Sequence, residues 1–195
     1  MRLKLAVTKG DKEIIKTIIK EYHSYVPTHK SVGRRIDFII YDNDMYHILG
    51  MIGVGSSVYP PPKDILKYIG KTKNEYKEIF NSFANNWRFC LIRRDDGFKI
   101  EENLGTRVLK EFRKQCKIEW KRKYGDDLRF LITFVGSGHD GTIYRADNWE
   151  CIGKTSGLPS HKSTSMKWST KQQLKDSFVK PSGGDLQKLI FIKEI

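Results

Sequence analysis

Residues 137–153 read SGHDGTIYRADNWECIG and hold a histidine, a tyrosine, an arginine and a tryptophan between glycine-containing ends. The glycines favour turns, and residues 142–147 predict a short helix between those turns. The apolar runs on both sides, LRFLITFVG (128–136) and WECIGKT (149–155), predict strands. By its periodicity alone, this unit is a strand, a short capped helix and a second strand.

Strands and helices alternate in the chain before this unit. An opening strand is predicted at residues 3–7, and the helical spacing of the isoleucines predicts a helix at 11–25 that ends before Pro27. Two β-rich runs within 36–58 flank a turn-forming Asp-Asn-Asp cluster, which predicts a hairpin. Residues 63–85 are predicted to be helical, with one interruption at a glycine.

Two longer elements form the centre of the predicted fold. The run WRFCLIR (87–93) shows little alternation, as expected for a strand that is buried on both faces. The longest helix is predicted from Asn103 to Tyr124. Its buried stripe repeats at every fourth residue and consists of Leu104, Val108, Phe112, Cys116 and Trp120.

The order of these elements predicts an α/β (α+β) fold with one central mixed sheet flanked by helices. A length of 195 residues suits one domain, which we place at 1–195. Its C-terminal segment, about 156–195, is basic and rich in serine and lysine; it predicts loops, followed by a closing strand in LQKLIFIKEI (186–195).

The composition favours a folded protein with a polyanionic partner. The net charge is +13, a balance typical of nucleic-acid-binding domains. A lysine-rich proteome or an effect on solubility is the alternative explanation. Three cysteines without a CxxC pattern indicate reduced thiols and no zinc site. The N-terminus lacks the apolar run of a signal peptide, and no stretch is apolar enough to span a membrane, so we expect a cytoplasmic protein.

The element order resembles that of the acetyltransferase-type (GNAT) fold, in which a central strand leads to a long helix whose N-terminus takes the cofactor pyrophosphate. In that fold a short helix with a tyrosine follows the next strand, often as "lYeklGFe". The present chain reads IYRADNWE at this place, so Tyr144 matches the tyrosine and Asn148-Trp149 stand where Gly-Phe would be.

A more specific resemblance is to phage DNA-modifying proteins of the Mom family, which carry "GHxGtIYqAxNWxYxG". Residues 138–149 read GHDGTIYRADNW, and Gly153 follows. The Druantia anti-phage protein DruA is similar over the same region, including "YH" near the first helix and the "G.T.G" at 153–157. The two resemblances cover roughly residues 20–160.

The Mom resemblance implies a transferase that adds a carbamoylmethyl-like group to the N6 amine of adenine in DNA. Matched position by position, it singles out His23, Arg88, Thr106, His139, Tyr144, Asn148 and Trp149. It also implies acetyl-CoA or a related acyl donor, and it allows iron, with Tyr144, His139 and His23 as candidate ligands. The chain departs from the pattern because ENLGTR (102–107) lacks the usual pyrophosphate loop.

We assign catalytic roles to Tyr144, His139, His23 and Arg88. A phenol donates a proton to a leaving group, and a histidine carries protons or binds metal or phosphate. Arginine on a central strand should meet a carboxylate or a phosphate. The structural alternatives are a buried tyrosine with a satisfied hydroxyl, histidines that stabilise helix ends, and an arginine held in an ion pair.

Binding roles fall on helix and strand ends. The free N–H groups at Asn103, Gly105 and Thr106 suit an anionic cofactor, although every helix start offers such groups. Ser56 and Ser57 follow a glycine-rich strand and either face the same cleft or form ordinary turn contacts. Trp149 either stacks an extruded base or packs in the core, and Asn148 suits a left-handed helix cap.

Phosphate contacts are expected on the basic face of the long helix and in the C-terminal segment, at Lys114, Lys121, Arg122 and Lys162. A solvated helix face is the alternative. Three functions therefore compete: a Mom-like DNA-base-modifying enzyme that acts on double-stranded DNA, a non-catalytic DNA-binding component of an anti-phage system, and a conventional acyl-CoA N-acyltransferase.

Overall fold

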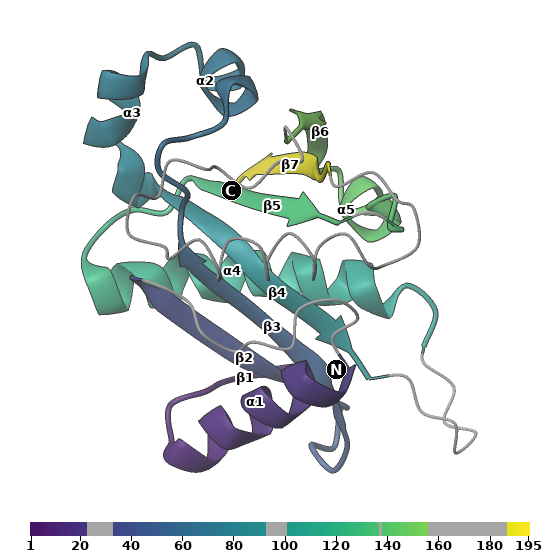
Figure 1. Cartoon of the computed structure of the whole chain (residues 1–195). Coiled ribbons are helices and arrows are strands. Elements are labelled where there is room, and N and C mark those ends of the chain that lie inside the picture. Colours follow the sequence, from purple (N-terminus) through teal and green to yellow (C-terminus); the bar gives the residue numbers. More distant parts are fainter. Residues whose placement is uncertain (23–32, 93–100, 137, 156–186) are drawn as a thin grey trace, which may run out of the picture.

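The computed structural model describes residues 1–22, 33–92, 101–136, 138–155 and 187–195, which form one seven-stranded mixed sheet with helices on both faces (Figure 1). The strands are β1 (Arg2–Leu5), β2 (Arg35–Tyr41), β3 (Ile48–Ser56), β4 (Phe83–Leu91), β5 (Phe130–Val135), β6 (Glu150–Lys154) and β7 (Leu189–Glu194). The helices are α1 (Lys9–Tyr22), α2 (Lys63–Ile69), α3 (Lys73–Glu78), α4 (Leu104–Tyr124) and α5 (Thr142–Ala146), with a 3-10 turn at Phe80–Ser82. The predicted fold class is confirmed.

The sheet has the strand order β1-β2-β3-β4-β5-β7-β6. Strands β1 to β4 form an antiparallel meander, β4 and β5 run parallel, and β5, β7 and β6 are antiparallel. The predicted hairpin is confirmed as β2 and β3. The predicted closing strand is also confirmed, and it is inserted between β5 and β6 as β7.

Helices α4 and α1 cover opposite faces of the sheet (Figure 1). Neighbouring residues of β2 accordingly point to opposite faces and belong to different hydrophobic clusters. Phe38 packs against α4, where its ring meets Phe112 edge to face at 5.8 Å. Ile39 packs against α1, beside Ile15. The predicted stripe of α4 is confirmed, since all five of its residues are buried.

The predicted helix at 63–85 is wrong over its last part. Helix α2 ends at Gly70, which adopts the left-handed conformation (φ 63°), and α3 begins with a capping box between Thr72 and Glu75. The chain enters β4 at Phe83, four residues earlier than predicted. The sequence NSFANN has no strong strand propensity there; pairing with β3 and β5 imposes the strand.

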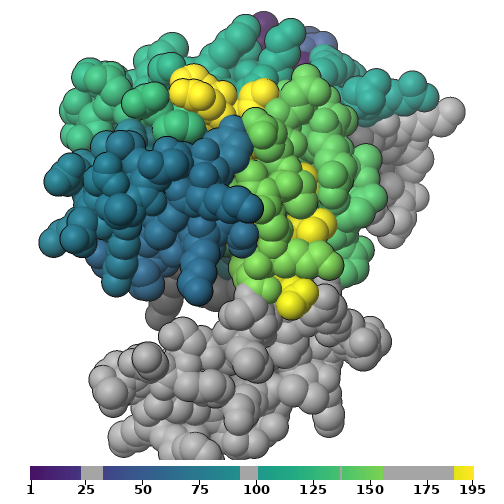
Figure 2. Space-filling view, turned by 90° about the horizontal axis from the view of Figure 1, so that it is seen from above, coloured from purple at the N-terminus to yellow at the C-terminus, as the bar shows by residue number. Residues whose placement is uncertain are grey.

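Helix α2 also packs against the far edge of the sheet. Tyr68 donates a hydrogen bond to Glu150 Oε1 of β6 at 2.7 Å, and a Cβ added to Gly153 would lie 2.6 Å from the carboxyl carbon of Asp64. The α2–α3 segment therefore abuts β6 in the view from above, as blue against light green (Figure 2). No helix in the described part of the chain is long and apolar enough to cross a membrane.

All three cysteines are free thiols, and burial determines the chemistry of two of them. Burial raises the pKa of Cys90 to about 11 and raises the pKa of Cys116 further still. These two thiols stay protonated at neutral pH and are therefore poor nucleophiles.

A buried carboxylate joins β1 to the start of α1. Asp11, with 3 % of its side chain exposed, accepts hydrogen bonds from Thr8 N (3.0 Å) and Val7 N (3.2 Å) and pairs with Lys4 at 2.7 Å. Thr8 Oγ1 accepts from Asp11 N in return. The bond with Lys4 and those with the backbone hold the pKa of Asp11 well below its usual range.

We expect Asp11→Asn to lower the free energy of unfolding by about 1–2 kcal/mol at pH 7, because the cap loses its charge and the ion pair. The folded pKa lies below the unfolded value, so this stabilisation is present above about pH 4 and disappears as the pH falls further. Urea denaturation at pH 7 and pH 3 measures both effects. Glu13→Gln, in an exposed pair with Lys16, is the control and should change little; an equal loss in both variants would contradict the assignment.

Candidate functional site

The parallel strands β4 and β5 part from each other in the middle of the sheet (Figure 1). Their pairing is confined to Phe83–Phe130, Ala84–Leu131 and Asn85–Ile132, although β4 continues to Leu91 and β5 to Val135. We call the point just beyond Asn85, where the pairing ends, the fork. The fork opens towards the N-terminus of α4 and towards α5. Residues of β4, α4 and α5 can therefore contribute to one site.

Asn86, the first residue of β4 beyond the last pair, joins the elements around the fork. Its Nδ2 donates to the carbonyl oxygens of Gly53 (2.8 Å) and Arg88 (3.1 Å), and its Oδ1 accepts from the Tyr144 hydroxyl at 2.8 Å. Thr133 Oγ1 of β5 donates to the Asn86 carbonyl at 3.2 Å. The side-chain amide of Asn86 therefore connects β3, β4 and α5. The main-chain carbonyl of Asn86 connects β4 to β5.

The side chains of Asn86 and Trp87 lie on opposite faces of the sheet, as those of successive strand residues do, and a β-bulge lies next to Asn86. Gly53 pairs with Arg88 and Val54 pairs with Asn86, so Trp87 is the extra residue of β4. Asn86 meets Tyr144 in the α4-side core, whereas Trp87 packs beside the α1-side cluster. The alternation of side chains along β4 thus gives the fork two chemically different sides.

Tyr144 is held by rings and by the turn that precedes α5. It is 7 % exposed, its ring lies 5.1 Å from Trp149 and 5.7 Å from Phe191, and Phe191 would touch any Cβ added to Gly141 (2.5 Å). Gly141 has a φ of 73°, which favours glycine. The position of the ring is therefore fixed, and its hydroxyl is directed at the fork.

The turn before α5 is stabilised by Asp140. Its Oδ1 accepts from the Thr142 hydroxyl (2.6 Å) and from the Thr142 N–H (3.0 Å). These two bonds lower the pKa of Asp140 below its usual value, so the carboxylate is charged at neutral pH. The negative charge lies at the N-terminal end of α5, where it is favourable.

A pocket of about 300 Å³ lies between the N-terminus of α4 and α5. It is lined by Leu91, Glu101, Asn103, Leu104, Gly105, Thr106, Thr142, Ile143 and Ala146. The first turn of a helix has N–H groups without intrahelical partners, so this pocket suits an anion. Gly105 allows the close packing here, because a Cβ at this position would lie 3.1 Å from Ile143 Cγ2. The Glu101 carboxylate at the rim is paired with Arg107.

The α1 side of the fork is cationic. The guanidinium of Arg88 lies 4.9 Å from the ring centre of Trp87, and its Nη1 donates to the Trp87 carbonyl at 2.6 Å. Burial lowers the pKa of Lys188, which precedes β7, and the nearby positive charge of Arg88 lowers it further. Two cations thus approach each other at the sheet, an arrangement that anions stabilise.

The structure does not bring Ser56 and Ser57 to the fork. Ser56 pairs with Ala84, at the end where β4 and β5 are still joined, and its Oγ accepts from Arg34 N at 2.8 Å. Ser57 Oγ shares a buried hydrogen bond with the Tyr76 hydroxyl at 2.7 Å. Both hydroxyls therefore make ordinary turn and packing contacts, which was the alternative to a role in the cleft. They lie at the end of the sheet where β4 and β5 are paired, away from the fork.

Asn148 and Trp149 complete the fold around Tyr144. Asn148 has the expected left-handed conformation (φ 57°) and follows Asp147, the C-cap of α5. Trp149 is 4 % exposed and donates from Nε1 to Asp147 Oδ2 at 2.9 Å, while Arg113 of α4 pairs with the same oxygen at 3.0 Å. This corrects the base-stacking expectation for Trp149, because its faces are occupied by the core.

The other predicted residues are dispersed. His139 is exposed in the loop before α5. Lys114 lies beside the groove between β1 and α4, whereas Lys121 and Arg122, near the C-terminus of α4, pair with Asp127 (2.9 Å) and Glu119 (2.5 Å). His23 and Lys162 lie outside the described residues. The structure therefore brings Tyr144 and Arg88 to the fork and the predicted cofactor residues beside it.

No group of three His, Cys, Asp or Glu side chains that could hold a metal ion occurs in the described segments.

Sequence reasoning missed Asn86, Trp87 and Lys188 as site residues. Asn86 was placed outside the predicted strand, so nothing marked its side chain as buried. The one available signal was the polar pair Asn85-Asn86 directly before an apolar run, which is unusual for a strand interior.

Several solved structures share this fold. Arabidopsis thaliana NAA60 in complex with acetyl-CoA is 9 % identical, covers 100 % of this chain and 99 % of its own, and has a TM-score of 0.54. A structure from Desulfovibrio desulfuricans assigned to the GNAT acetyltransferases has 9 % identity, 99 % and 98 % coverage and a TM-score of 0.53. The Drosophila melanogaster polyamine N-acetyltransferase has 10 % identity, full coverage of both chains and a TM-score of 0.52. At these identities the likeness shows the GNAT fold.

In sequence, the family described as "Druantia protein DruA" matches residues 1–177. None of the curated proteins compared with the chain matches it.

We expect Tyr144→Phe to lower the free energy of unfolding by about 1–3 kcal/mol, because the buried Asn86 Oδ1 loses its donor. Tyr68→Phe, which removes a hydroxyl bonded at the surface, should cost less than about 1 kcal/mol. Chemical denaturation of both variants gives the comparison. Equal costs would show that the bond between Tyr144 and Asn86 is not the buried contact described above.

Proposed function

The chain belongs to the Druantia protein DruA family and has the GNAT fold, and from this premise we propose that it is a defence-associated transferase. It would move a small acyl-derived group from an acyl-CoA-type donor to an amine. We further propose that the amine belongs to DNA, with the N6 amine of adenine as the Mom-like target. The observation that carries the proposal is the position of α5: its Tyr144 hydroxyl is held at the fork by Asn86, and its residues Thr142, Ile143 and Ala146 line the pocket at the N-terminus of α4.

The residues at the N-terminus of α4 fit a pyrophosphate-bearing donor. Backbone N–H groups at Gly105 and Thr106 would hold the anion, and the adjoining pocket would accept the rest of the cofactor. When bound, such a donor supplies an activated acyl carbon. The chain lacks the usual glycine-rich loop, so affinity would depend on this single helix terminus.

Tyr144 is the residue that can hold or release a proton at the fork. A phenol is protonated at neutral pH, which suits donation to a leaving group. Asn86 fixes the direction of the hydroxyl by accepting its hydrogen bond at 2.8 Å, and the three rings of Tyr144, Trp149 and Phe191 exclude water around it. Arg88, two residues along β4, would contact the acceptor and not the donor, because its guanidinium lies over Trp87 on the α1 side.

The charge of the protein favours DNA over a cationic acceptor. The chain carries +13, and Arg88 and Lys188 interact electrostatically next to the fork. A polyamine would be repelled there, whereas the phosphates of a nucleic acid would be attracted. A base-paired adenine has its N6 amine in use, so the target nucleotide would have to be extruded or single-stranded.

A non-catalytic role is the second candidate, and one observation favours it. Tyr144 is almost completely buried and its proton is committed to Asn86, as in an ordinary satisfied core tyrosine. In this case the protein would bind nucleic acid in the defence system without a cofactor.

The two functions differ in their response to Tyr144→Phe. If the protein is a transferase, we expect modified adenine in DNA from cells that express it, and a loss of about 10²- to 10⁴-fold in modification for the variant. Nucleoside mass spectrometry of the DNA measures this, with equal amounts of soluble protein and with Tyr68→Phe as the matched hydroxyl deletion. Unmodified DNA with wild-type protein, or full modification with Tyr144→Phe, would count against the transferase.

A further inference from the structure

Two arginines lie over one tryptophan on the α1 face of the sheet. The Cζ atom of Arg35 is 4.1 Å from the ring centre of Trp87, and that of Arg88 is 4.9 Å from it. Arg35 begins β2, whereas Trp87 and Arg88 form the bulge of β4. We call these three side chains the platform.

Asp37 holds the platform together. Its Oδ1 accepts from Trp87 Nε1 at 3.0 Å, and its Oδ2 accepts from Arg35 Nε at 2.5 Å. Burial raises the pKa of Asp37, and the charge and hydrogen bond of Arg35 oppose that shift. Gly53 of β3 lies beneath both groups, where an added Cβ would come within 2.3 Å of Asp37 Oδ1 and 2.5 Å of Trp87 Nε1. The indole can therefore lie across β3 because Gly53 has no side chain.

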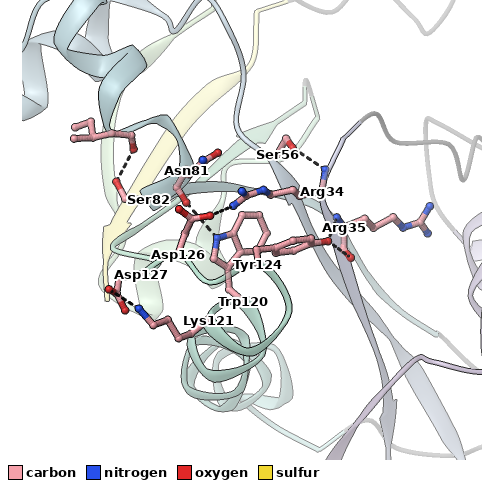
Figure 3. Close-up of polar contacts among 11 residues, drawn as sticks. Arg34, Arg35, Ser56, Asn81, Ser82, Trp120, Lys121, Tyr124, Asp126 and Asp127 are labelled. Carbon is pink, nitrogen blue, oxygen red and sulfur yellow. Dashed lines mark hydrogen bonds and ion pairs between the residues drawn. The ribbon is translucent and has the colours of Figure 1, made fainter.

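The opposite face of the sheet fixes the backbone of Arg35. Figure 3 shows Arg34 pointing to Trp120, Tyr124 and Asp126 at the C-terminal end of α4, whereas Arg35 points away from them. The Tyr124 hydroxyl accepts from Arg35 N at 2.7 Å and donates to Arg35 O at 3.0 Å. Lys123 Nζ donates to the same carbonyl at 2.8 Å. The position of the platform is thus set before any ligand arrives.

Positive charge predominates around the platform. Among the described residues, Arg35 pairs with the Asp37 carboxylate, Arg88 lies over Trp87, and Lys188 is close enough to Arg88 for their charges to interact. The whole chain carries a net charge of +13. This charge suits an anionic ligand, and the half-buried indole adds a flat apolar surface.

We propose that the platform is the docking site for single-stranded DNA, with a phosphate held by the guanidinium groups of Arg35 and Arg88 and a base stacked against Trp87 or its arginines. Arginine binds phosphate through a planar fork of donors, and bases stack on aromatic and guanidinium planes without regard to sequence. The inference rests on the proposed function, since it places the acceptor of the transfer reaction at the platform. The platform adjoins the fork because Asn86 and Trp87 are consecutive residues of β4. It specifies the acceptor as an extruded or unpaired nucleotide on the α1 side.

The test is titration of a fluorescent oligo-dT strand with the full chain, without any acyl donor, followed by anisotropy at several salt concentrations. We expect Arg88→Ala to weaken binding at least about tenfold and to reduce the slope of log K against log salt by about 0.7. Trp87→Leu should weaken binding about 5- to 150-fold, whereas Trp87→Phe should retain most of it. Arg129→Ala is the matched control, since Arg129 also lies over an aromatic ring (Phe130, 5.4 Å) and near a carboxylate (Glu194, 3.4 Å) but is remote from the platform.

These binding measurements test the platform without the transfer reaction, because no acyl donor is present. Arg88→Lys retains the charge without the planar guanidinium and gives a second reading if Arg88→Ala does not fold. Binding by Arg88→Ala and Trp87→Leu that equals that of wild type, or tight binding of spermidine in place of the oligonucleotide, would overturn the proposal. Binding that depends on Arg88 and Trp87, found together with unmodified cellular DNA, would support the platform and count against the transferase.

Discussion

The hydrogen bond between Tyr144 and Asn86 is the contact on which the site depends. Strands β4 and β5 stop pairing after Asn85, so the groups at the fork need another partner. Asn86 provides it by bonding to the backbone of Gly53 and to the Tyr144 hydroxyl. Leaving the buried amide of Asn86 without its partner would lower the stability of the fold. The bond to Tyr144 therefore holds α5 against the sheet, and with it the pocket between α5 and the start of α4.

The side chains of Asn86 and Trp87, which point to opposite faces of the sheet, divide the site into two chemically distinct sides. On the α4 side lie the tyrosine hydroxyl, apolar rings and the helix terminus, which together suit an anionic cofactor and proton transfer. On the α1 side lie arginines and an exposed part of an indole, which suit a nucleotide. A group-transfer enzyme needs a donor and an acceptor to approach one point from different directions, and the fork between diverging strands allows this without a deep cavity.

The sequence predicted the fold better than the site. Helix α4 and strands β5 and β7 have strong periodic or apolar patterns, and these were found with small errors at their ends. The beginning of β4 was missed because Asn85 and Asn86 have low strand propensity, and only pairing with β3 and β5 makes them part of a strand. The same error hid the fork, since Asn86 has no pattern that marks it as a partner of Tyr144, 58 residues away in the chain. Ser56, Ser57 and Trp149 were plausible by residue type, but strand direction and burial decide where they point.

The most direct measurement of the central claim, that the fork and the α4 terminus form one donor site, is hydrogen exchange with and without acetyl-CoA. We expect slower exchange in two segments distant in sequence, residues 104–108 at the start of α4 and residues 142–146 of α5, because a donor bound there would occupy the first N–H groups of α4 and stabilise α5 against the sheet. Unchanged exchange in both segments at saturating acetyl-CoA, or protection confined to the groove between β1 and α4, would contradict the claim.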